Sequence, residues 1–289
     1  MKLEDKSQYL RKQRFHFDFL GQCQDFSVWQ DVINNYHLWN ARKSNKVVIP
    51  RKIHQIWISG KLPREYRELS KSWTTIMPDY EYKLWDESEI QKISSPLQDL
   101  FNKAKNPGVK SDIGRYMILK SEGGMYVDTD FEAVRNIEPC LSGSEFICGQ
   151  APANPKGTIE YLNGLIASIP NHPIINIVVE KLGAISQIDE QDAMTIINST
   201  GPTLLTDAVN SIERTSAVGC LPSNYFYPWP AFMKECSDIP SQFYTECTYA
   251  VHHWGCSWFK WIDYEKLGTL GKLKFKIKNS INQFKKVPK

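Results

Sequence analysis

The chain has 289 residues, enough for one large domain or for one domain with extensions. Hydrophobic residues make up 42% of the sequence and charged residues 23%, which is ordinary for a globular protein, and no repeat or low-complexity segment is visible. The net charge of +3 hides an asymmetry, because residues 266–289 contain eight lysines and no acidic residue. The remainder is mildly acidic, which argues against nucleic acid as a partner.

The sequence indicates neither secretion nor membrane insertion. Its seven cysteines are scattered and form no Cys-x-x-Cys pair, which favours free thiols in a reducing compartment. The first residues carry no signal peptide, and no stretch of about 18 apolar residues could form a transmembrane helix. We therefore expect a cytoplasmic protein.

The first third of the chain predicts an α/β domain behind a helical segment. Residues 1–46 carry aromatic and apolar residues at helical spacing and predict a helical N-terminal extension that packs on the main domain, residues 47–265. The main domain begins with a β-rich run, Lys52–Ile58, followed by a helix over Leu62–Ile76 and a second strand over Tyr80–Trp85. A strand, crossover helix and strand in this order predict a mostly parallel sheet with right-handed crossovers.

The centre of the chain, Lys110–Phe131, predicts a helix, a glycine stop, a short buried strand and an Asp-x-Asp sequence. Asp112 and Arg115 share a face of the helix because they are three residues apart. Asp128 and Asp130 follow the strand, where ligands bind in open α/β sheets. Two carboxylates at this spacing suit a hard divalent cation that also holds a diphosphate.

The second half predicts further strands and helices, and a basic tail. We expect strands at Phe131–Val134, as a continuation of the main sheet, at Glu145–Cys148 and at Tyr249–Trp254. We expect helices at Pro173–Ile185, Asp189–Asn198 and Thr203–Ile212. In the tail, residues 266–289, one apolar helical stripe is surrounded by lysines, which is typical of a helix on an anionic membrane surface. The alternative is a helix whose stripe packs on the body. The stripe consists of Leu270, Leu273, Ile277, Ile281 and Phe284.

The central motif, Ser111–Tyr116 with Gly123–Asp130, resembles glycosyltransferase family 32. The Asp-x-Asp region of that family is shared with the large clostridial glucosylating toxins. The resemblance spans about residues 47 to 260 and favours a bacterial polysaccharide-type member. One departure is Gly114, where the family more often has a bulky residue; glycine inside a helix costs roughly 1 kcal/mol relative to alanine. The resemblance extends to Ile49–Trp57, Tyr80–Asp86, Asn163–Ile166, Thr200–Pro202 and His252–Trp258.

This resemblance implies a GT-A fold, a Rossmann-like and mostly parallel sheet with flanking helices. It also implies a nucleotide-sugar donor, preferably a UDP-sugar, and a divalent cation, Mn²⁺ or Mg²⁺. Asp130 is the first choice as a direct metal ligand, and Asp128 is expected to share the metal. His253 is the best match for a third ligand and His252 the alternative, since neighbours on a strand point to opposite faces.

The resemblance also implies the residues that hold the donor. Asp112 would accept hydrogen bonds from sugar hydroxyls, Arg115 would neutralise it or reach the phosphate, and Tyr116 lies beside them. The alternative for Asp112 and Arg115 is a purely structural ion pair, and the alternative for Trp57 is a tryptophan buried in the core without a ligand. Further expected contacts are Trp57 stacked on uracil, Asn163 as the donor-sugar amide, and Ser257 and Trp258 closing over the diphosphate. The expected catalytic set is Asp112, Arg115, Asp128, Asp130 and Asn163.

Together these features predict a metal-dependent, retaining hexosyltransferase. We expect it to act as a peripheral protein on the inner face of the cell membrane. The expected acceptor is a lipid-linked saccharide, such as an O-antigen or capsule intermediate. Two alternatives stay open: a toxin-like enzyme that modifies a protein acceptor, and a non-catalytic nucleotide-sugar-binding protein.

Overall fold

The computed structural model describes residues 26–42, 44, 46–152, 159–229, 231 and 244–255, with the side chains of 26–32 excepted. The predicted basic tail and residues 1–25 of the predicted extension lie outside this part. None of the described helices is long and apolar enough to cross a lipid bilayer.

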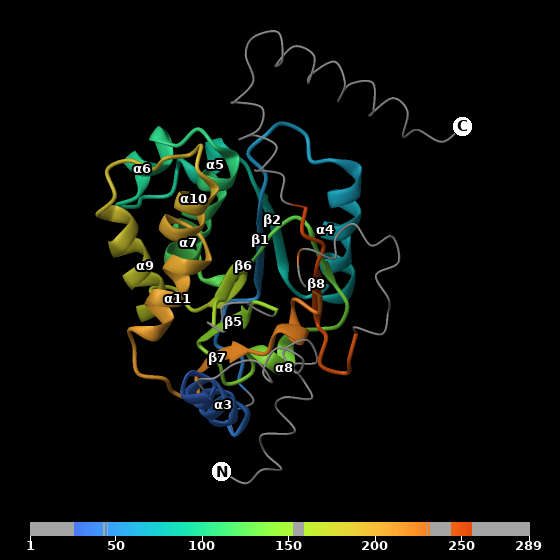
Figure 1. Cartoon of the computed structure of the whole chain (residues 1–289). Coiled ribbons are helices and arrows are strands. Elements are labelled where there is room, and N and C mark those ends of the chain that lie inside the picture. Colours follow the sequence, from blue (N-terminus) through green and yellow to red (C-terminus); the bar gives the residue numbers. More distant parts are fainter. Residues whose placement is uncertain are drawn as a thin grey trace.

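A six-stranded sheet forms the centre of the molecule, in the order β2-β1-β3-β6-β5-β7 (Figure 1). Strand β6 runs antiparallel to both of its neighbours, and the other neighbouring pairs are parallel. The expected fold class, an α/β GT-A type with a mostly parallel sheet, is confirmed. The strands are β1 Lys52–Ile56, β2 Glu81–Trp85, β3 Gly124–Val127, β5 Phe146–Gln150, β6 Tyr161–Ser168 and β7 Val218–Leu221.

Helices cover both faces of this sheet, so its central strands are buried on both sides and read as near-continuous apolar runs. On one face α7, α9, α10 and α11 pack together, and α4 lies on the other face (Figure 1). The helices are α3 Phe26–Asn40, α4 Arg64–Ile76, α5 Glu87–Ile90, α6 Gln98–Lys103, α7 Pro107–Glu122, α8 Glu138–Leu141, α9 Pro173–Gly183, α10 Ala193–Ser199 and α11 Pro202–Asn210, with a 3₁₀ turn at Ser223–Tyr225.

Helix α7 is the buried helix of the fold. The Asn106 side chain caps its start by accepting the Gly108 amide at 2.8 Å. The helix runs unbroken through Gly114, where an added Cβ would lie 3.1 Å from side-chain atoms of both Ile56 and Ile90. The missing side chain at 114 therefore lets the helix approach strand β1 closely.

The prediction that Phe131–Val134 continues the main sheet is wrong. The Phe131 amide donates to the Asp128 carbonyl at 3.1 Å, and this turn takes the chain out of the sheet. Strand β4, Phe131–Ala133, instead pairs antiparallel with β8, Ala250–His252, in a separate two-stranded sheet. This pairing brings the last described strand next to the Asp-x-Asp sequence.

Within the predicted extension, helix α3 packs on the main domain. Tyr36 and Trp39 are buried, and the Trp39 indole donates to the Ser144 hydroxyl at 2.9 Å. The same hydrophobic cluster contains Ile53 of β1. Helix α3 therefore shares a core with the sheet.

Candidate active site

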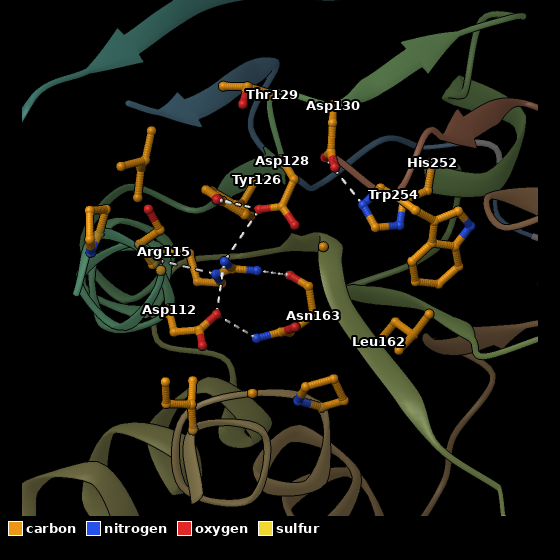
Figure 2. Close-up of a pocket in the computed structure, with 18 of the residues that line it drawn as sticks. Asp112, Arg115, Tyr126, Asp128, Thr129, Asp130, Leu162, Asn163, His252 and Trp254 are labelled. Carbon is orange, nitrogen blue, oxygen red and sulfur yellow. Dashed lines mark hydrogen bonds and ion pairs between the residues drawn. The ribbon is translucent and has the colours of Figure 1, made fainter. Parts of the chain in front are cut away.

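A cavity of about 710 Å³ opens at the edge of the sheet where the parallel strands end. This volume lies within the range of small-molecule sites, roughly 300–1,000 Å³. Its walls come from the segments that follow β1 and β3, from α7, from the start of β6, and from β8 and the residues after it. Segments from both halves of the chain therefore form one site (Figure 2).

Asp128 is fixed at the end of β3 by its backbone and by its side chain. Its amide donates to the Gly164 carbonyl at 2.8 Å, and the Tyr126 hydroxyl donates to Oδ1 at 2.7 Å. The guanidinium of Arg115 lies 3.3 Å from the same oxygen. Burial raises the pKa of Asp128, and the Arg115 charge opposes that rise. The second carboxylate oxygen, Oδ2, lies close to Gly164, which also lines the cavity.

Asp130 faces His252 across the small sheet (Figure 2). Nε2 of His252 lies 3.1 Å from Oδ1 of Asp130, and the Gly255 amide donates to Oδ2 at 2.6 Å. Burial alone would raise the pKa of Asp130, but His252 and the Gly255 amide outweigh it and hold the pKa below its usual range. The carboxylate is therefore ionised at neutral pH.

The structure brings His252, and not His253, to the two aspartates. The ring of His253 points the other way, with Nε2 3.0 Å from Glu132, because successive side chains on a strand alternate. The sequence-based preference for His253 is therefore corrected to the alternative, His252.

Asp128, Asp130 and His252 can fit a divalent cation. Each offers one ligand atom, and these three atoms lie within 4.8 Å of one another. Two carboxylate oxygens and an imidazole nitrogen form a donor set that suits Mn²⁺, and the carboxylates also suit Mg²⁺.

A second network lies beside the aspartates and joins α7 to β6. Arg115 forms an ion pair with Asp112 at 2.9 Å and also donates to the Asn163 carbonyl. The Asn163 amide donates to Asp112 at 3.0 Å, and the Thr200 hydroxyl donates to its other oxygen at 2.8 Å. Burial raises the pKa of Asp112 to about 6, while Arg115 and the two hydrogen bonds act against that rise. This pair is buried and multiply bonded, unlike an exposed helical ion pair.

An irregularity in β6 aims Asn163 into this network. Cys148 of β5 pairs with Ile166, and the next residue, Gly149, pairs with Leu162. Residues 163–165 therefore have no partner on β5. Such bulges re-aim side chains and are frequent next to active sites.

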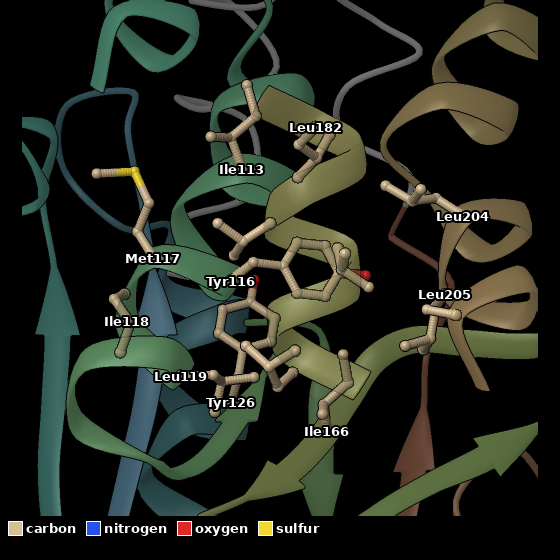
Figure 3. Close-up of a cluster of buried hydrophobic side chains, with 14 of the residues drawn as sticks. Ile113, Tyr116, Met117, Ile118, Leu119, Tyr126, Ile166, Leu182, Leu204 and Leu205 are labelled. Carbon is tan, nitrogen blue, oxygen red and sulfur yellow. The ribbon is translucent and has the colours of Figure 1, made fainter. Parts of the chain in front are cut away.

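Other predicted donor residues differ in how they lie relative to the cavity. Trp57 lines it just beyond β1, and its indole donates to the Ser59 carbonyl at 3.0 Å. Tyr116 does not line it, because its ring is fully buried among apolar residues of α7, α9 and α11 (Figure 3). Ser257 and Trp258 lie outside the described residues.

Sequence reasoning missed three supports of the site. Tyr126 bonds to Asp128, Thr200 bonds to Asp112, and Gly164 leaves room for the Asp128 carboxylate, since an added Cβ would lie 2.9 Å from Oδ2. Tyr126 and Gly164 lie within the motifs that carried the resemblance, so their positions were a usable signal. Thr200 also lies within one of these segments, Thr200–Pro202, but nothing in the sequence indicated its bond to Asp112, which lies 88 residues away.

Comparison with known proteins identifies the family of this site. Residues 63–147 match the glycosyltransferase sugar-binding region containing the DXD motif. A glycosyltransferase of Acanthamoeba polyphaga mimivirus is 30% identical over 191 residues, covering 63% of this chain and 74% of the relative. The chain belongs to this glycosyltransferase family. It is therefore an enzyme of the transferase class.

Further relatives of this glycosyltransferase come from yeasts. A mannosyl phosphorylinositol ceramide synthase of Saccharomyces cerevisiae is 30% identical over 198 residues, covering 66% of this chain and 49% of the relative. An inositol phosphoceramide mannosyltransferase of Schizosaccharomyces pombe is 27% identical over 179 residues, covering 61% and 48%. The chain thus spans about half the length of these yeast relatives. These relatives are viral and fungal, so membership of a bacterial polysaccharide-type group stays a prediction.

Solved structures with a similar fold include glycosyltransferase domains of toxins. The PaToxG glycosyltransferase has a TM-score of 0.47 at 22% identity, covering 64% of this chain and 79% of that chain. The catalytic domain of alpha-toxin from Clostridium novyi has a TM-score of 0.45 at 11% identity, covering 82% and 83%. With scores this low, the fold assignment rests on the sheet and helices themselves.

Proposed function

We propose that this glycosyltransferase moves a hexose from a nucleotide sugar to an acceptor hydroxyl, and that the preferred donor is a UDP-sugar. The reaction retains the anomeric configuration and requires a divalent cation. One observation carries the proposal. The cation-fitting cluster of Asp128, Asp130 and His252 lies in the same cavity as the Asp112–Arg115 network, and Arg115 contacts both aspartates, 112 and 128.

The cluster provides for the leaving group. Asp128, Asp130 and His252 would hold Mn²⁺ or Mg²⁺, which when bound neutralises the charge that develops on a departing nucleoside diphosphate. Arg115 adds a fixed positive charge beside Asp128, and its contacts leave it little freedom to reorient. Charge already in position stabilises a transition state without reorganisation at the moment of reaction.

The network provides for the sugar. Asp112 and Asn163 line the cavity and can accept and donate hydrogen bonds to hydroxyls of the transferred hexose. Because Thr200 and Arg115 already hold the Asp112 side chain, and the Asn163 side chain donates to Asp112, orientation of the sugar costs little side-chain entropy. Trp57, at the β1 end of the cavity, is proposed to stack on the nucleobase. We assign no protein nucleophile; a same-face displacement assisted by the leaving phosphate is consistent with retention.

For the acceptor, the sequence favours a lipid-linked saccharide of a surface polysaccharide, acted on at the inner face of the membrane. The yeast relatives favour a second candidate. Several are named as inositol phosphoceramide mannosyltransferases, which supports a mannosyl donor and an inositol-bearing lipid acceptor. Both candidates share a membrane-bound acceptor with a hydroxyl-rich head.

The donor is tested by hydrolysis in the absence of an acceptor. UDP-glucose, UDP-galactose, UDP-N-acetylglucosamine and GDP-mannose are incubated with Mn²⁺, and release of the nucleoside diphosphate is measured. We expect turnover of one donor, its loss with EDTA, and a rate lower by roughly a hundredfold or more in Asp130→Asn. If no donor turns over, or if Asp130→Asn matches the wild type, the proposed activity is wrong. Thermal stabilisation by a donor without turnover would indicate a binding protein instead.

Membrane association is tested separately. A chain ending at Glu265 is compared with the full chain for binding to vesicles that contain phosphatidylserine. We expect weaker binding of the shorter chain, since each lysine near an anionic surface contributes about 1 kcal/mol. Equal binding would remove the tail from the proposal.

A further inference from the structure

One carboxylate in the cavity has no part in the donor roles above. Glu160 immediately precedes β6 and lines the cavity. Because β6 runs antiparallel to its neighbours, its start lies at the edge where β1 and β3 end, on which ligands bind. Glu160 therefore reaches the same site as Trp57, from β6, which lies two strands away from β1 in the sheet.

The register of β6 determines where the Glu160 side chain points. The Ala151 amide donates to the Glu160 carbonyl at 2.8 Å, which extends the β5–β6 ladder one residue beyond Tyr161. Residues two apart on a strand face the same way, so Glu160 and Leu162 share a face. Leu162 belongs to the apolar cluster against which Trp254 packs, and both line the cavity on the side away from Asp112 (Figure 2).

The cavity wall around this position is otherwise apolar. Besides Asn163, which is bonded to Asp112, the side chains that β6, α10 and α11 contribute to the lining are hydrocarbon. They are Leu162, Ile196, Ile197 and Pro202. The Trp254 indole adds an aromatic face, fixed by its donation to the Trp229 carbonyl at 3.0 Å.

The Glu160 carboxylate is partly buried without a partner. In the part of the chain that the structure describes, no hydrogen bond or ion pair reaches its side chain, and burial raises its pKa. Partial burial of an unpaired carboxylate costs stability. A group kept at such a cost inside a ligand cavity indicates a binding function.

We propose that Glu160, Leu162 and Trp254 form the acceptor subsite, and that the acceptor group bound there is an uncharged hydroxyl-bearing ring, a pyranose or a cyclic polyol. A carboxylate accepts hydrogen bonds from two adjacent hydroxyls, and the apolar faces of Leu162 and Trp254 cover the C–H face of such a ring. The negative charge of Glu160 disfavours a phosphate or carboxylate at the same place. This inference rests on the proposed function, because it requires a donor on the Asp128 side of the cavity.

The test compares neutral and charged acceptors in wild type, Glu160→Gln and Glu145→Gln. Glu145 is exposed just before β5, at the opposite edge of the sheet, and gives a matched loss of charge away from the cavity. The neutral probes are the n-octyl glycosides of glucose, galactose and mannose, and myo-inositol. The charged probes are glucose 6-phosphate and mannose 6-phosphate. Transfer and donor hydrolysis are measured together, with thermal unfolding as the check on folding.

We expect wild type and Glu145→Gln to transfer to at least one neutral ring and poorly to the phosphorylated ones. In Glu160→Gln the acceptor KM rises by roughly tenfold or more, as expected when a hydrogen bond to a charged group becomes one to a neutral group. The donor KM changes less, so the ratio of transfer to hydrolysis falls. Discrimination against the phosphorylated rings weakens.

Three results would overturn the inference while leaving the donor site intact. The first is that Glu160→Gln and Glu145→Gln have the same acceptor KM. The second is that the wild type transfers to phosphorylated rings as well as to neutral ones. The third is that the donor is hydrolysed but no neutral probe accepts the sugar. Absence of hydrolysis with every donor would instead remove the proposed function, and this inference with it.

Discussion

Two histidines that are adjacent in the sequence have different surroundings. His252 lies against Asp130, and His253 lies against Glu132. We predict that His252→Ala raises the Mn²⁺ concentration for half-maximal donor hydrolysis by at least about tenfold, the loss seen even for residues that only support metal ligands. The measurement is a Mn²⁺ titration of hydrolysis.

The neighbouring substitution, His253→Ala, is the matched control. It removes an imidazole from the residue just after β8 but leaves the three clustered ligand atoms in place, so the half-maximal Mn²⁺ concentration should stay close to that of wild type. A larger effect at 253 than at 252 would reverse the assignment.

The buried Asp112 predicts an acidic limit to activity. Its pKa of about 6 exceeds the value of about 4 usual for an aspartic acid, so the carboxylate is protonated and weakens its pair with Arg115 as the pH falls through 6. We expect kcat/KM to fall over that range. Stability changes in the opposite direction: the folded state binds this proton more tightly, so the contribution of Asp112 to stability decreases as the pH rises from about 4 to about 6.

Thr200 provides a way to move this limit. Its hydroxyl bonds to the ionised carboxylate, so Thr200→Val should raise the pKa of Asp112 further and shift the acidic limb upward by on the order of one pH unit. Thr200→Ser keeps the hydroxyl and should keep the wild-type profile. Identical pH profiles in the valine and serine variants would show that the hydroxyl does not set this pKa.

At this scale the sequence predicted the members of the site better than their partners. The motif identified Asp112, Arg115, Asp128 and Asp130, all of which line the cavity. The alternation of side chains along a strand showed that only one of the two histidines could point toward the aspartates, but it does not determine which one. Tyr116 was misplaced because the helix around it is buried on nearly all sides, so sharing a turn with Arg115 did not bring it to the cavity.

At the scale of elements, α7 shows how packing decides a position that helix propensity alone would misjudge. Gly114→Ala gains about 1 kcal/mol of helix propensity but meets the tips of Ile56 and Ile90, so its stability should stay within about 1 kcal/mol of wild type. Gly114→Leu, the bulkier choice, should destabilise the fold by about 1–3 kcal/mol or more through overpacking. Urea unfolding measures both. A leucine variant as stable as the alanine variant would mean that α7 and β1 can separate at little cost.

The irregular register of β6 lay beyond sequence reasoning. The strand's apolar residues and its asparagine were visible, but a bulge depends on which residues of β5 it pairs with. The same limit applied to β4, where a tight turn after Asp128 decided the sheet to which the strand belongs. Periodicity predicts that a strand exists and which residues share a face, whereas its neighbour is set by tertiary contacts.

At the scale of the molecule, the order of strands and helices was enough to predict an α/β sheet, and the boundary at residue 47 stays a prediction. A domain starting at residue 47 treats α3 as an addition. In the structure, Trp39 of α3 is buried in the same core as β1, and its indole donates to the Ser144 hydroxyl. A Cβ added to Gly219 of β7 would lie only 2.7 Å from the indole nitrogen of Trp39. Gly219 thus leaves room for the indole.

We therefore predict that α3 unfolds together with the sheet. Trp39→Ala should lower the free energy of unfolding by about 3–5 kcal/mol, the usual cost of truncating a buried aromatic side chain. Its exposed neighbour on the same helix provides the control: Leu38→Ala should change stability by no more than about 0.5 kcal/mol. Urea unfolding followed by fluorescence and by circular dichroism measures both. If Trp39→Ala instead produces a separate early transition and leaves the main midpoint in place, α3 is an independent strap and the fold begins after it, as the sequence suggested.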